Sequence, residues 1–214
     1  EACQDQGIIF IGPSKDAIQS MGDKVMARQL AGEAGLPLVP GTKGEISDTE
    51  APGEAQRIGY PIMVKAADGG GGIGIRRVDS PEELESALER SRSLAQGSFG
   101  SNRMYLERLV APAAHVEVQV MADHYGNTIH LFERDCSMQR RNQKVIEESP
   151  TARLNTKTRD KLHKAAVNLV KHIGYTNAGT VEFLVDQKGD FYFLEMNTRL
   201  QVEHPVTEMI TNLD

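Results

Sequence analysis

Two runs of alternating hydrophobic and polar residues near the C-terminal end predict a β-hairpin. They flank Lys188 and Gly189, a pair suited to a two-residue turn. With this turn, Glu182 lies directly opposite Glu195, and their Cβ atoms are roughly 4.5–5.5 Å apart. Residues 199–203 are expected to remain extended, so that their odd-numbered members share the face of Glu195.

Apolar residues spaced three and four positions apart predict helices. The longest covers Asn155 to Ile173. Another opens at Ser80 with a capping box and a proline in its first turn. Its apolar face consists of Leu84, Ala87, Leu88, Leu94 and Ala95. Shorter helices are expected over residues 14–21, 23–34 and 47–58, and a last one begins at Pro205.

Short apolar or alternating runs predict strands. They cover residues 7–12, 60–67, 75–78, 103–109, 115–120 and 128–132. Residues 96–102 are expected to form a polar loop before the fourth of these strands. Strict alternation over 115–120 places His115, Glu117 and Gln119 on one face. A single histidine on a polar strand face is typically exposed to solvent.

The pairing of Glu182 with Glu195 has a chemical consequence. Two carboxylates facing each other across a ladder repel, and a divalent cation between them would turn repulsion into ligation. Asn197 shares the parity of Glu195 and adds an amide oxygen. Oxygen ligands of this kind suit Mg²⁺ or Mn²⁺ better than zinc. The alternative is an ordinary hairpin whose acidic residues are solvated.

A glycine-rich run follows a strand that carries Lys65. It reads Asp68-Gly-Gly-Gly-Gly-Ile-Gly74, and a second strand follows. Glycines allow backbone N–H groups to approach phosphate oxygens closely. The pattern is neither a P-loop nor a dinucleotide fingerprint, since no helix follows the glycines directly. It predicts either a flap over phosphates or a flexible hairpin tip.

Two groups of basic residues have open interpretations. Lys24 falls in the first turn of a predicted helix, where a cation is unfavourable, so it is either solvated or paired with an anion. Solvation is the simpler interpretation. Arg140, Arg141 and Lys144 lie in the charged run 133–148, which is either solvated or an anion site.

Composition limits the classes of protein that fit. The chain has 214 residues and a formal charge of −6, which argues against nucleic acid as the main partner. Cys3 and Cys136 lack metal-site spacing and indicate a reducing compartment. No apolar run reaches the ~18 residues of a membrane span. The chain begins at Glu1 without a methionine, and we expect a cytoplasmic fragment of one large or two small domains.

Several segments together resemble a known family. MVKAADGGGGIG, YLERL, HVEVQV, ERDCSMQRRNQKVIEE, GTVEFLV and FLEMNTRLQVEHPVTEMI are similar to biotin carboxylases, which are members of the ATP-grasp superfamily. The resemblance runs nearly end to end and implies an α+β, ATP-grasp fold. It also implies the tail of an N-terminal domain over 1–35, a flap subdomain over 36–109 and a metal-binding, catalytic subdomain over 110–214.

The resemblance also implies roles for individual residues. Mg²⁺ or Mn²⁺ would be held by Glu182, Glu195 and Asn197. ATP phosphates would be contacted by Lys24, Lys65, Gly70, Gly71 and Gly72. The adenine edge would be read by Glu107, Arg108 and Val110, and the ribose side by His115 and Gln139, with Asn142 nearby. Charge on the transferring group would be neutralised by Lys144 and Arg199. Bicarbonate would be positioned by Gln201 and Val202 and deprotonated by Glu203.

The implied reaction joins ATP and bicarbonate to carboxyphosphate, and the carboxyl group then passes to biotin on a carrier protein. Expected partners are the biotin carboxyl carrier protein or domain and a carboxyltransferase subunit, in a parent enzyme that is oligomeric. Ile73 and Asn142 depart from the family pattern. A phosphate contact missing at Ile73 could be supplied by Arg76 or Arg77. The alternative is a catalytically incomplete fragment that acts only as a nucleotide-binding module.

Overall fold

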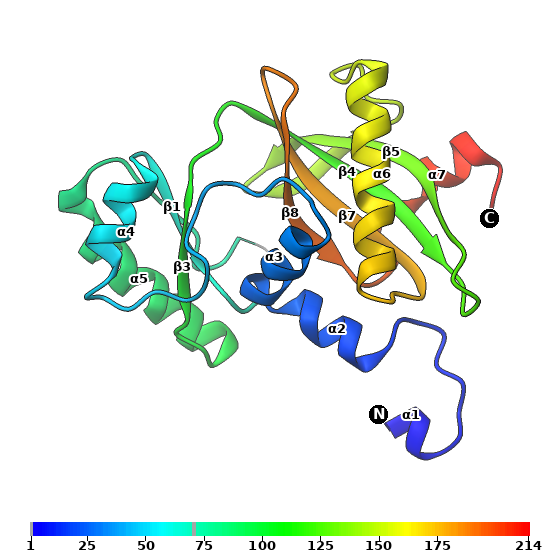
Figure 1. The fold of residues 1–214 in the computed structure, drawn as a ribbon, viewed down its shortest axis with the longest axis horizontal. Helices are drawn as coiled ribbons and strands as arrows, with labels where there is room; N and C mark the ends of the chain where they lie inside the picture. The colour runs from blue at the N-terminus through cyan, green and yellow to red at the C-terminus, as the bar shows by residue number, and fades with distance from the viewer. Residues whose placement is uncertain (1, 70–71) are drawn as a thin grey trace.

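The computed structural model describes residues 2–69 and 72–214, which form two antiparallel sheets with helices packed against them (Figure 1). The chain opens with a single helical turn, α1 (Ala2–Asp5). Within these residues no helix has both the length and the apolar character needed to cross a membrane.

The smaller sheet has the strand order β2-β1-β3. Its strands are β1 (Ile62–Ala66), β2 (Arg76–Val78) and β3 (Met104–Arg108). The helices α4 (Ala51–Ile58) and α5 (Pro81–Phe99) contact these strands. The side chains of Ile62, Val64 and Val78 are buried between the sheet and these helices. This small core is separate from the one beneath the larger sheet.

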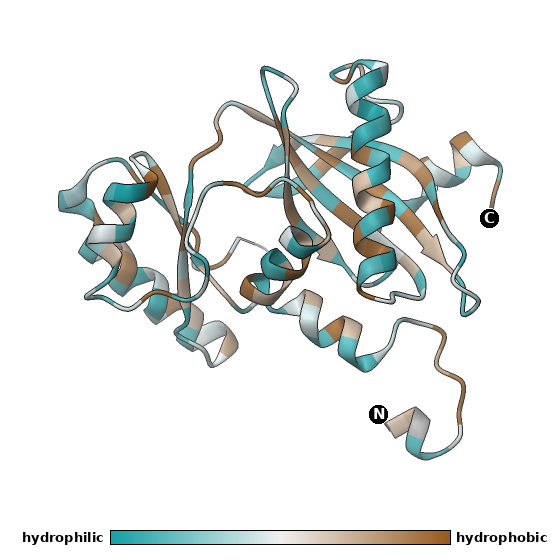
Figure 2. Ribbon diagram, viewed as in Figure 1, coloured by the Kyte–Doolittle hydropathy of each residue, from teal (hydrophilic) through white to brown (hydrophobic). Residues whose placement is uncertain are grey.

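The larger sheet has the strand order β6-β5-β4-β7-β8. Its strands are β4 (Ala113–Ala122), β5 (Thr128–Arg140), β6 (Gln143–Glu148), β7 (Asn177–Asp186) and β8 (Phe191–Asn197). One face packs on α2 (Lys15–Gly22), α3 (Lys24–Glu33) and α6 (Thr156–His172). Figure 2 shows the hydrophobic segments gathered on the strands beneath α6. Each buried Val, Leu or Phe side chain there contributes roughly 1.5–3 kcal/mol.

The opposite face of the larger sheet is polar and is reached by α7 (His204–Thr211). Alternation sends Val116, Val118 and Val120 into the core, so the residues between them face the other way. Those residues are charged or polar, yet Glu117 and Gln119 are fully buried. Buried polar groups need partners, and this face supplies them.

Residues 36–46 connect the two sheets. Phe193 N donates to Pro37 O (2.8 Å) at the edge of the larger sheet. Thr42 N donates to Leu106 O (2.9 Å) and Ile46 N to Met104 O (2.8 Å) along the smaller one. The segment therefore fixes how the small sheet sits over the end of the large one.

The C-terminal hairpin has the predicted carboxylate pairing, but its turn differs from the predicted one. Asp186 N donates to Asp190 O (2.9 Å), so three residues rather than two form the loop. The register then shifts by one between Glu182 and Phe183, which leaves Leu194 as an extra residue in β8. Glu182 pairs with Glu195 because the longer loop and the bulge compensate each other.

The strand predicted over residues 7–12 does not form. No described strand lies beside this segment, so its backbone groups have no ladder partners. Ile9 and Ile11 are 91% and 88% exposed. A strand needs a neighbour, and local sequence cannot supply one.

Other boundaries also differ from the predicted ones. Helix α4 begins at Ala51 rather than residue 47, because Ser47 and Glu50 bond each other in a preceding turn (Ser47 Oγ to Glu50 Oε2, 2.5 Å). Helix α5 continues through the predicted loop to Phe99 and ends at Gly100, whose φ of 70° suits glycine. Leu94 is 46% exposed and does not join the apolar face. Strand β5 extends through the charged run to Arg140.

Asp23 is expected to matter for the stability of α3. Its Oδ1 accepts hydrogen bonds from Val25 N (2.9 Å) and Met26 N (3.0 Å), which satisfies two N–H groups at the helix start. Asp23→Ala should lower the free energy of unfolding by about 1–2 kcal/mol in urea titrations. Asp23→Asn keeps the accepting oxygen and should lose less. Equal losses in the two variants would contradict a capping role.

A buried cluster joins α6 to β5 and should make stability depend on pH. Burial on its own would raise the pKa of Glu133, but hydrogen bonds from His163 (2.7 Å) and Arg159 (2.7 Å) lower it from 4.5 to about 2. A carboxyl group with a depressed pKa stabilises the fold above its unfolded value and loses that contribution as pH falls. The free energy of unfolding should therefore decline between pH 4.5 and about 2.

Urea titrations across that pH range check this expectation. Glu133→Gln should show a shallower decline, whereas Glu85→Gln, an exposed position on α5, should behave like the unmodified chain. Parallel pH profiles for Glu133→Gln and the unmodified chain would contradict it.

Candidate functional site

A row of charged residues crosses four neighbouring strands of the larger sheet. Arg134 of β5 pairs with Glu117 of β4, Glu117 with Glu182 of β7, and Glu182 with Glu195 of β8. Lys144 of β6 adds a fifth member. Three carboxylates side by side repel one another, so the surrounding cations and donors decide their charge states.

Glu182 lies at the centre of this row and is buried. Its Oε2 contacts His115 Nε2 (2.7 Å), and its Oε1 accepts from Lys144 Nζ (2.9 Å) and Asn197 Nδ2 (2.8 Å). Burial alone would raise the pKa of Glu182, but His115 and Lys144 lower it to about 2. His115 is therefore paired rather than solvated, contrary to expectation.

Lys144 is held by three carboxylates. Its Nζ donates to Glu117, to Glu182 and to Glu203 Oε1 (2.6 Å). Burial opposes its charge, but Glu182 and Glu117 raise its pKa. Lys144 in turn lowers the pKa of Glu203 against the effect of burial. An ionised carboxylate beside a fixed ammonium group can accept a proton from a substrate and stabilise developing negative charge.

Glu195 and Asn197 have the donor chemistry that a divalent cation requires. Among the described residues, the ion-pair partner of Glu195 is Lys24, with Nζ 3.8 Å from Oε2. Burial and the charge of Glu182 raise the pKa of Glu195. Within the part of the chain that the structure describes, the hydrogen bond that Asn197 Oδ1 accepts is a long one, from Arg199 (3.4 Å). These oxygens are free to ligate, and a cation between the carboxylates would remove their repulsion, so the residues fit Mg²⁺ or Mn²⁺.

Lys24 lines a cavity of about 200 Å³ beside the predicted metal ligands. Residues from the start of α3 and the end of β8 form its walls, among them Glu195, Asn197 and Arg199. Lys24 Nζ donates to the carbonyl oxygen of Gly69, at the start of the glycine run. The solvated interpretation of Lys24 is wrong, because tertiary contacts place it between the flap and β8.

Lys65 is buried and its ammonium group is paired with Glu107. Both Lys65 and Arg28 donate to the carboxylate of Glu107, which is itself buried. Arg28 also donates to Val39 O (2.9 Å). Two cations on one carboxylate leave a net positive charge in this layer, which favours an anion such as a phosphate group nearby.

The predicted adenine-reading segment runs from β3 into the connection to β4. The Glu107 side chain is engaged by the two cations, and its main chain lies in the ladder opposite Met63 of β1. Arg108 N donates to Pro40 O (2.7 Å) and its side chain to Ile58 O (3.1 Å). Val110 is half-buried just beyond β3. The structure therefore places Glu107, Arg108 and Val110 where the smaller sheet connects to the larger one.

The glycine run reaches the polar face from the smaller sheet. Gly70 and Gly71 lie outside the described residues. Gly72 has a φ of 77°, and a Cβ on it would lie 2.8 Å from Asn142 Nδ2, so the flap meets the turn between β5 and β6. Ile73 is exposed. Arg77 pairs with Asp79 (2.6 Å).

Arg76 and Arg77 differ in the face they occupy. Arg76 pairs with Val64, a core residue, and Arg77 with Met63, which lies two positions before Lys65 on the same strand. Strand alternation therefore puts Arg77 on the Lys65 face and Arg76 on the helix side. Arg76 and Arg77 were named as possible substitutes for a phosphate contact missing at Ile73. Arg77 is the better candidate because it shares the face of Lys65.

The remaining predicted residues divide into those gathered at the row and those outside it. Gln139 Nε2 lies 2.7 Å from His115 Nδ1. Gln201 is buried and donates to Glu182 Oε1 (3.3 Å). Arg199 is exposed and donates to Leu200 O (3.1 Å). Val202 is 93% exposed, so only its main chain can contact a ligand held at the row.

The extended conformation predicted for 199–203 is wrong. The chain turns at Val202 and Glu203, and Glu203 becomes the residue before α7. Glu203 nevertheless reaches Lys144, because the turn folds back over the polar face. If residues 199–203 had continued β8 as an extended chain, Glu203 would lie about one strand length beyond the end of β8.

Sequence reasoning missed Glu117, Arg134 and Arg28 as members of the site. A signal for Glu117 was present, since a polar alternation on a strand with a fully apolar opposite face indicates a buried polar layer. Arg134 lies in the charged run 133–148, for which a solvated run and an anion site were both open interpretations. Arg140 and Arg141 in that run are exposed, as solvation predicts.

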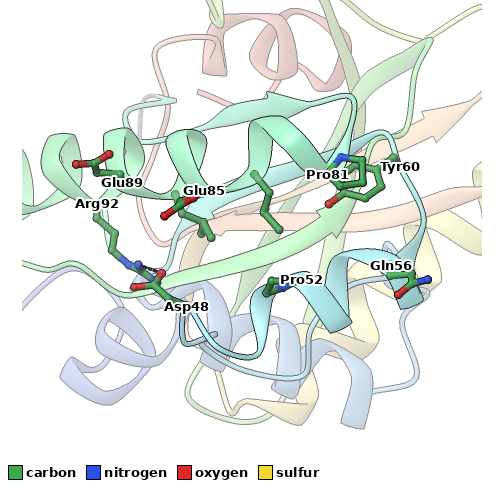
Figure 3. Close-up of a pocket in the computed structure, with 10 residues that line it drawn as sticks. Asp48, Pro52, Gln56, Tyr60, Pro81, Glu85, Glu89 and Arg92 are labelled. Carbon is green, nitrogen blue, oxygen red and sulfur yellow. Dashed lines mark hydrogen bonds and ion pairs between the residues drawn. The ribbon is translucent and has the colours of Figure 1, made fainter.

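A larger cavity, of about 950 Å³, lies elsewhere, between α4 and α5. Figure 3 shows the ion pair of Arg92 with Asp48 at one end and Tyr60 at the other. Leu84 and Leu88 form part of its wall. It shares no lining residue with the charged row and offers no comparable set of acids and bases.

A glycine flap set over an acidic, lysine-bearing sheet face defines a domain of the ATP-grasp class. The chain belongs to the family described as carbamoyl-phosphate synthase L chain, ATP-binding domain, which matches residues 23–214. The expected family resemblance and the α+β, ATP-grasp fold are confirmed.

Known proteins similar to this chain are biotin-dependent carboxylases. It is 55% identical to biotin carboxylase 2 of Bacillus subtilis, over all of this chain and 48% of that protein. It is 56% identical to pyruvate carboxylase 1 of Caenorhabditis elegans, over all of this chain and 18% of that one. The chain thus spans about half the length of the biotin carboxylase it matches.

Solved structures give the same result. A biotin carboxylase of Campylobacter jejuni, in a complex named for β,γ-ATP, has a TM-score of 0.97 and 51% identity, over all of this chain and 48% of that one. The biotin carboxylase domain of Hydrogenobacter thermophilus 2-oxoglutarate carboxylase, described with MgADP, ADP and bicarbonate, has a TM-score of 0.96 and 48% identity, over all of this chain and 47% of that one.

Proposed function

We propose that this chain is the ATP-binding, catalytic core of a biotin carboxylase. It would join ATP and bicarbonate to carboxyphosphate and transfer the carboxyl group to N1′ of biotin on a carrier protein. One observation carries the proposal: the oxygen ligands Glu182, Glu195 and Asn197 lie beside the base Glu203 and the cation Lys144. Nucleotide binding alone needs neither of the last two.

The residues fit the sequence of events in this reaction. A bound Mg²⁺ or Mn²⁺ held by Glu182, Glu195 and Asn197 would supply charge neutralisation on the phosphates. Lys24, Lys65 and the glycines, including Gly72, bind the phosphate groups, and the main chain of Glu107, Arg108 and Val110 contacts the adenine. His115, Gln139 and Asn142 border the ribose side.

Proton movement is assigned to Glu203. Its carboxylate is kept ionised by Lys144, so it can take the proton of bicarbonate as the bicarbonate oxygen attacks the γ-phosphorus and ADP departs. Gln201, the main chain of Val202 and Arg199 hold the anion. In the transfer step, the C–O bond of carboxyphosphate breaks, the departing phosphate takes the proton of N1′, and N1′ bonds to the carboxyl carbon. Arg199 and Lys144 stabilise the negative charge on the carboxyl group and on the biotin urea during this step.

The whole protein is proposed to have further parts and partners. Its own partners would be a biotin carboxyl carrier protein or domain and a carboxyltransferase subunit, in a cytoplasmic oligomer. Separate sheets and separate cores support a flap subdomain over 36–109 and a metal-binding subdomain over 110–214. Residues 1–35 would belong to the end of an N-terminal domain, which accounts for the exposed Ile9 and Ile11.

Calorimetric titration with ATP, with and without Mg²⁺, together with bicarbonate-dependent ATP hydrolysis, tests the proposal. Binding that requires Mg²⁺ and hydrolysis stimulated by free biotin are expected from the full-length protein. Binding without bicarbonate-dependent hydrolysis would favour a nucleotide-binding module instead. Absence of ATP binding would reject both.

A further inference from the structure

Arg134, at the β5 end of the charged row, is fully buried and uses every hydrogen-bond donor that its side chain has. Its five N–H groups have five acceptors on four parts of the fold. These are Glu117 Oε1 (2.6 Å), Gln119 Oε1 (2.9 Å), Thr207 Oγ1 (2.7 Å), Thr180 Oγ1 (3.4 Å) and Gln201 Oε1 (3.3 Å). Arg134 therefore connects β4, β7, the 198–203 segment and α7.

The contact with Gln201 determines which way that amide group points. An arginine can only donate, so the atom of Gln201 facing Arg134 must be the carbonyl oxygen. The amide NH₂ group is then directed to the other side, where it donates to Glu182 Oε1 (3.3 Å). Its second hydrogen remains available to an anion at the row.

The contact with Glu117 acts on Lys144 in the same manner. Arg134 Nε holds Oε1 of Glu117, which leaves Oε2 to accept from Lys144. Both carboxylate oxygens are thereby fixed, and Lys144 is held between Glu117, Glu182 and Glu203. Arg134 thus holds in place the Gln201 amide group and, through Glu117, the Lys144 ammonium group.

We propose that Arg134 is a positioning residue that presents the Gln201 amide hydrogens and the Lys144 ammonium group to an oxyanion substrate. This inference rests on the proposed function, because the oxyanion it serves is bicarbonate. The hydrogen-bond partners described for Arg134 do not include Glu182, Glu195 or Asn197. It acts through Gln201 and Glu117.

Lysine cannot reproduce this arrangement. Its three donors radiate from one nitrogen, whereas the planar guanidinium group spreads five donors over three nitrogens. Arg134→Lys keeps the buried positive charge that Glu117 needs, so the variant has a better prospect of folding than Arg134→Met. It loses the fork that reaches Gln201 and Glu117 together.

Arg134→Lys in the full-length protein is the first test. The value of kcat/KM for bicarbonate should fall roughly 10- to 100-fold, because small misplacements of donors have effects of this size. KM for Mg-ATP should change by less than about twofold, the scatter expected for sites that do not interact. Arg159→Lys is the matched control, since Arg159 also binds a buried glutamate, Glu133, but lies outside the row.

A double-mutant cycle with Gln201→Ala separates positioning from a general structural role. If Arg134 acts through Gln201, then Arg134→Lys should have a much smaller effect on kcat/KM for bicarbonate in the Gln201→Ala background. Independent, multiplying effects of the two substitutions would overturn the proposal. So would equal kinetic losses in Arg134→Lys and Arg159→Lys.

Hydrogen exchange gives a readout that does not depend on turnover. Backbone amides of residues 198–203 should exchange faster in Arg134→Lys than in Arg159→Lys, because the segment loses its buried anchor. Unchanged exchange in that segment would overturn the positioning role. Failure of the unmodified protein to hydrolyse ATP with bicarbonate would instead reject the proposed function. Hydrogen exchange would still show whether Arg134 anchors residues 198–203.

Discussion

Replacing Glu195 by glutamine is expected to weaken binding of Mg-ATP by at least about 10- to 100-fold, the loss typical when even an indirect partner of a metal site is removed. Glu195 is the carboxylate with fewest internal partners at the row, and its charge is therefore available to a cation. Glutamine keeps the shape of the side chain but takes one negative charge from the metal.

The same substitution should stabilise the chain when no nucleotide is present. Glu195 faces Glu182 across the ladder, and their repulsion raises the pKa of Glu195. Removing one charge relieves that repulsion. Thermal melting with and without Mg-ATP measures both effects in one experiment. Opposite signs of the two effects are the signature of a site whose charges are arranged for a ligand.

Glu89→Gln is the matched control for Glu195→Gln. Glu89 is exposed on α5, so the same change of charge there should alter neither Mg-ATP affinity nor melting. Affinity for Mg-ATP that is unchanged in Glu195→Gln would count against the metal assignment. Equal weakening in both variants would indicate only the change in net charge.

Replacing Lys144 by methionine is expected to abolish most of the turnover while Mg-ATP still binds. Lys144 is the ammonium group shared by Glu117, Glu182 and Glu203. Its loss should reduce kcat roughly 100- to 1000-fold, as removal of one preorganised donor does elsewhere. Glu182 keeps His115 and Asn197 as partners, so the metal ligands remain in place.

Lys144→Met should also lower the free energy of unfolding, by about 3–5 kcal/mol, because buried carboxylates lose their counter-charge. Urea titration gives the stability and steady-state hydrolysis gives kcat. Lys157→Met, at an exposed position in the first turn of α6, is the control and should change neither. Full turnover in Lys144→Met would contradict the role of Lys144 as the cation of the transferring group. Glu195→Gln and Lys144→Met therefore separate Mg-ATP binding from the chemical step.

The helices show how far local pattern predicts structure. Asn155 caps α6 through Thr158 N (2.9 Å), and Asp23 caps α3. Capping and helical periodicity involve residues at most four positions apart, so a short stretch of sequence contains all the groups that take part. Two boundaries were mispredicted: α4 begins late because Ser47 and Glu50 form a turn before it, and α5 continues past Gln96 to Phe99.

In the C-terminal hairpin the predicted pairing of Glu182 with Glu195 is correct, although the predicted two-residue turn is not. Alternation along both strands required Glu182 and Glu195 to share a face, and that requirement held. The turn itself was mispredicted, because Asp186 Oδ1 accepts from Lys188 N (2.9 Å) and Asp190 N (3.0 Å) and closes a longer loop. A bulge in β8 then restored the register.

By itself, the sequence determined most of the helices, most of the strands and the facing carboxylates, since each depends on neighbours in the chain. Only the tertiary structure decided that Arg134, Glu117, Glu182 and Glu195 form one row. They come from strands whose row members are separated by up to 78 positions and become neighbours only through sheet order. The partner of a buried charge depends on long-range register and burial, which no local period encodes.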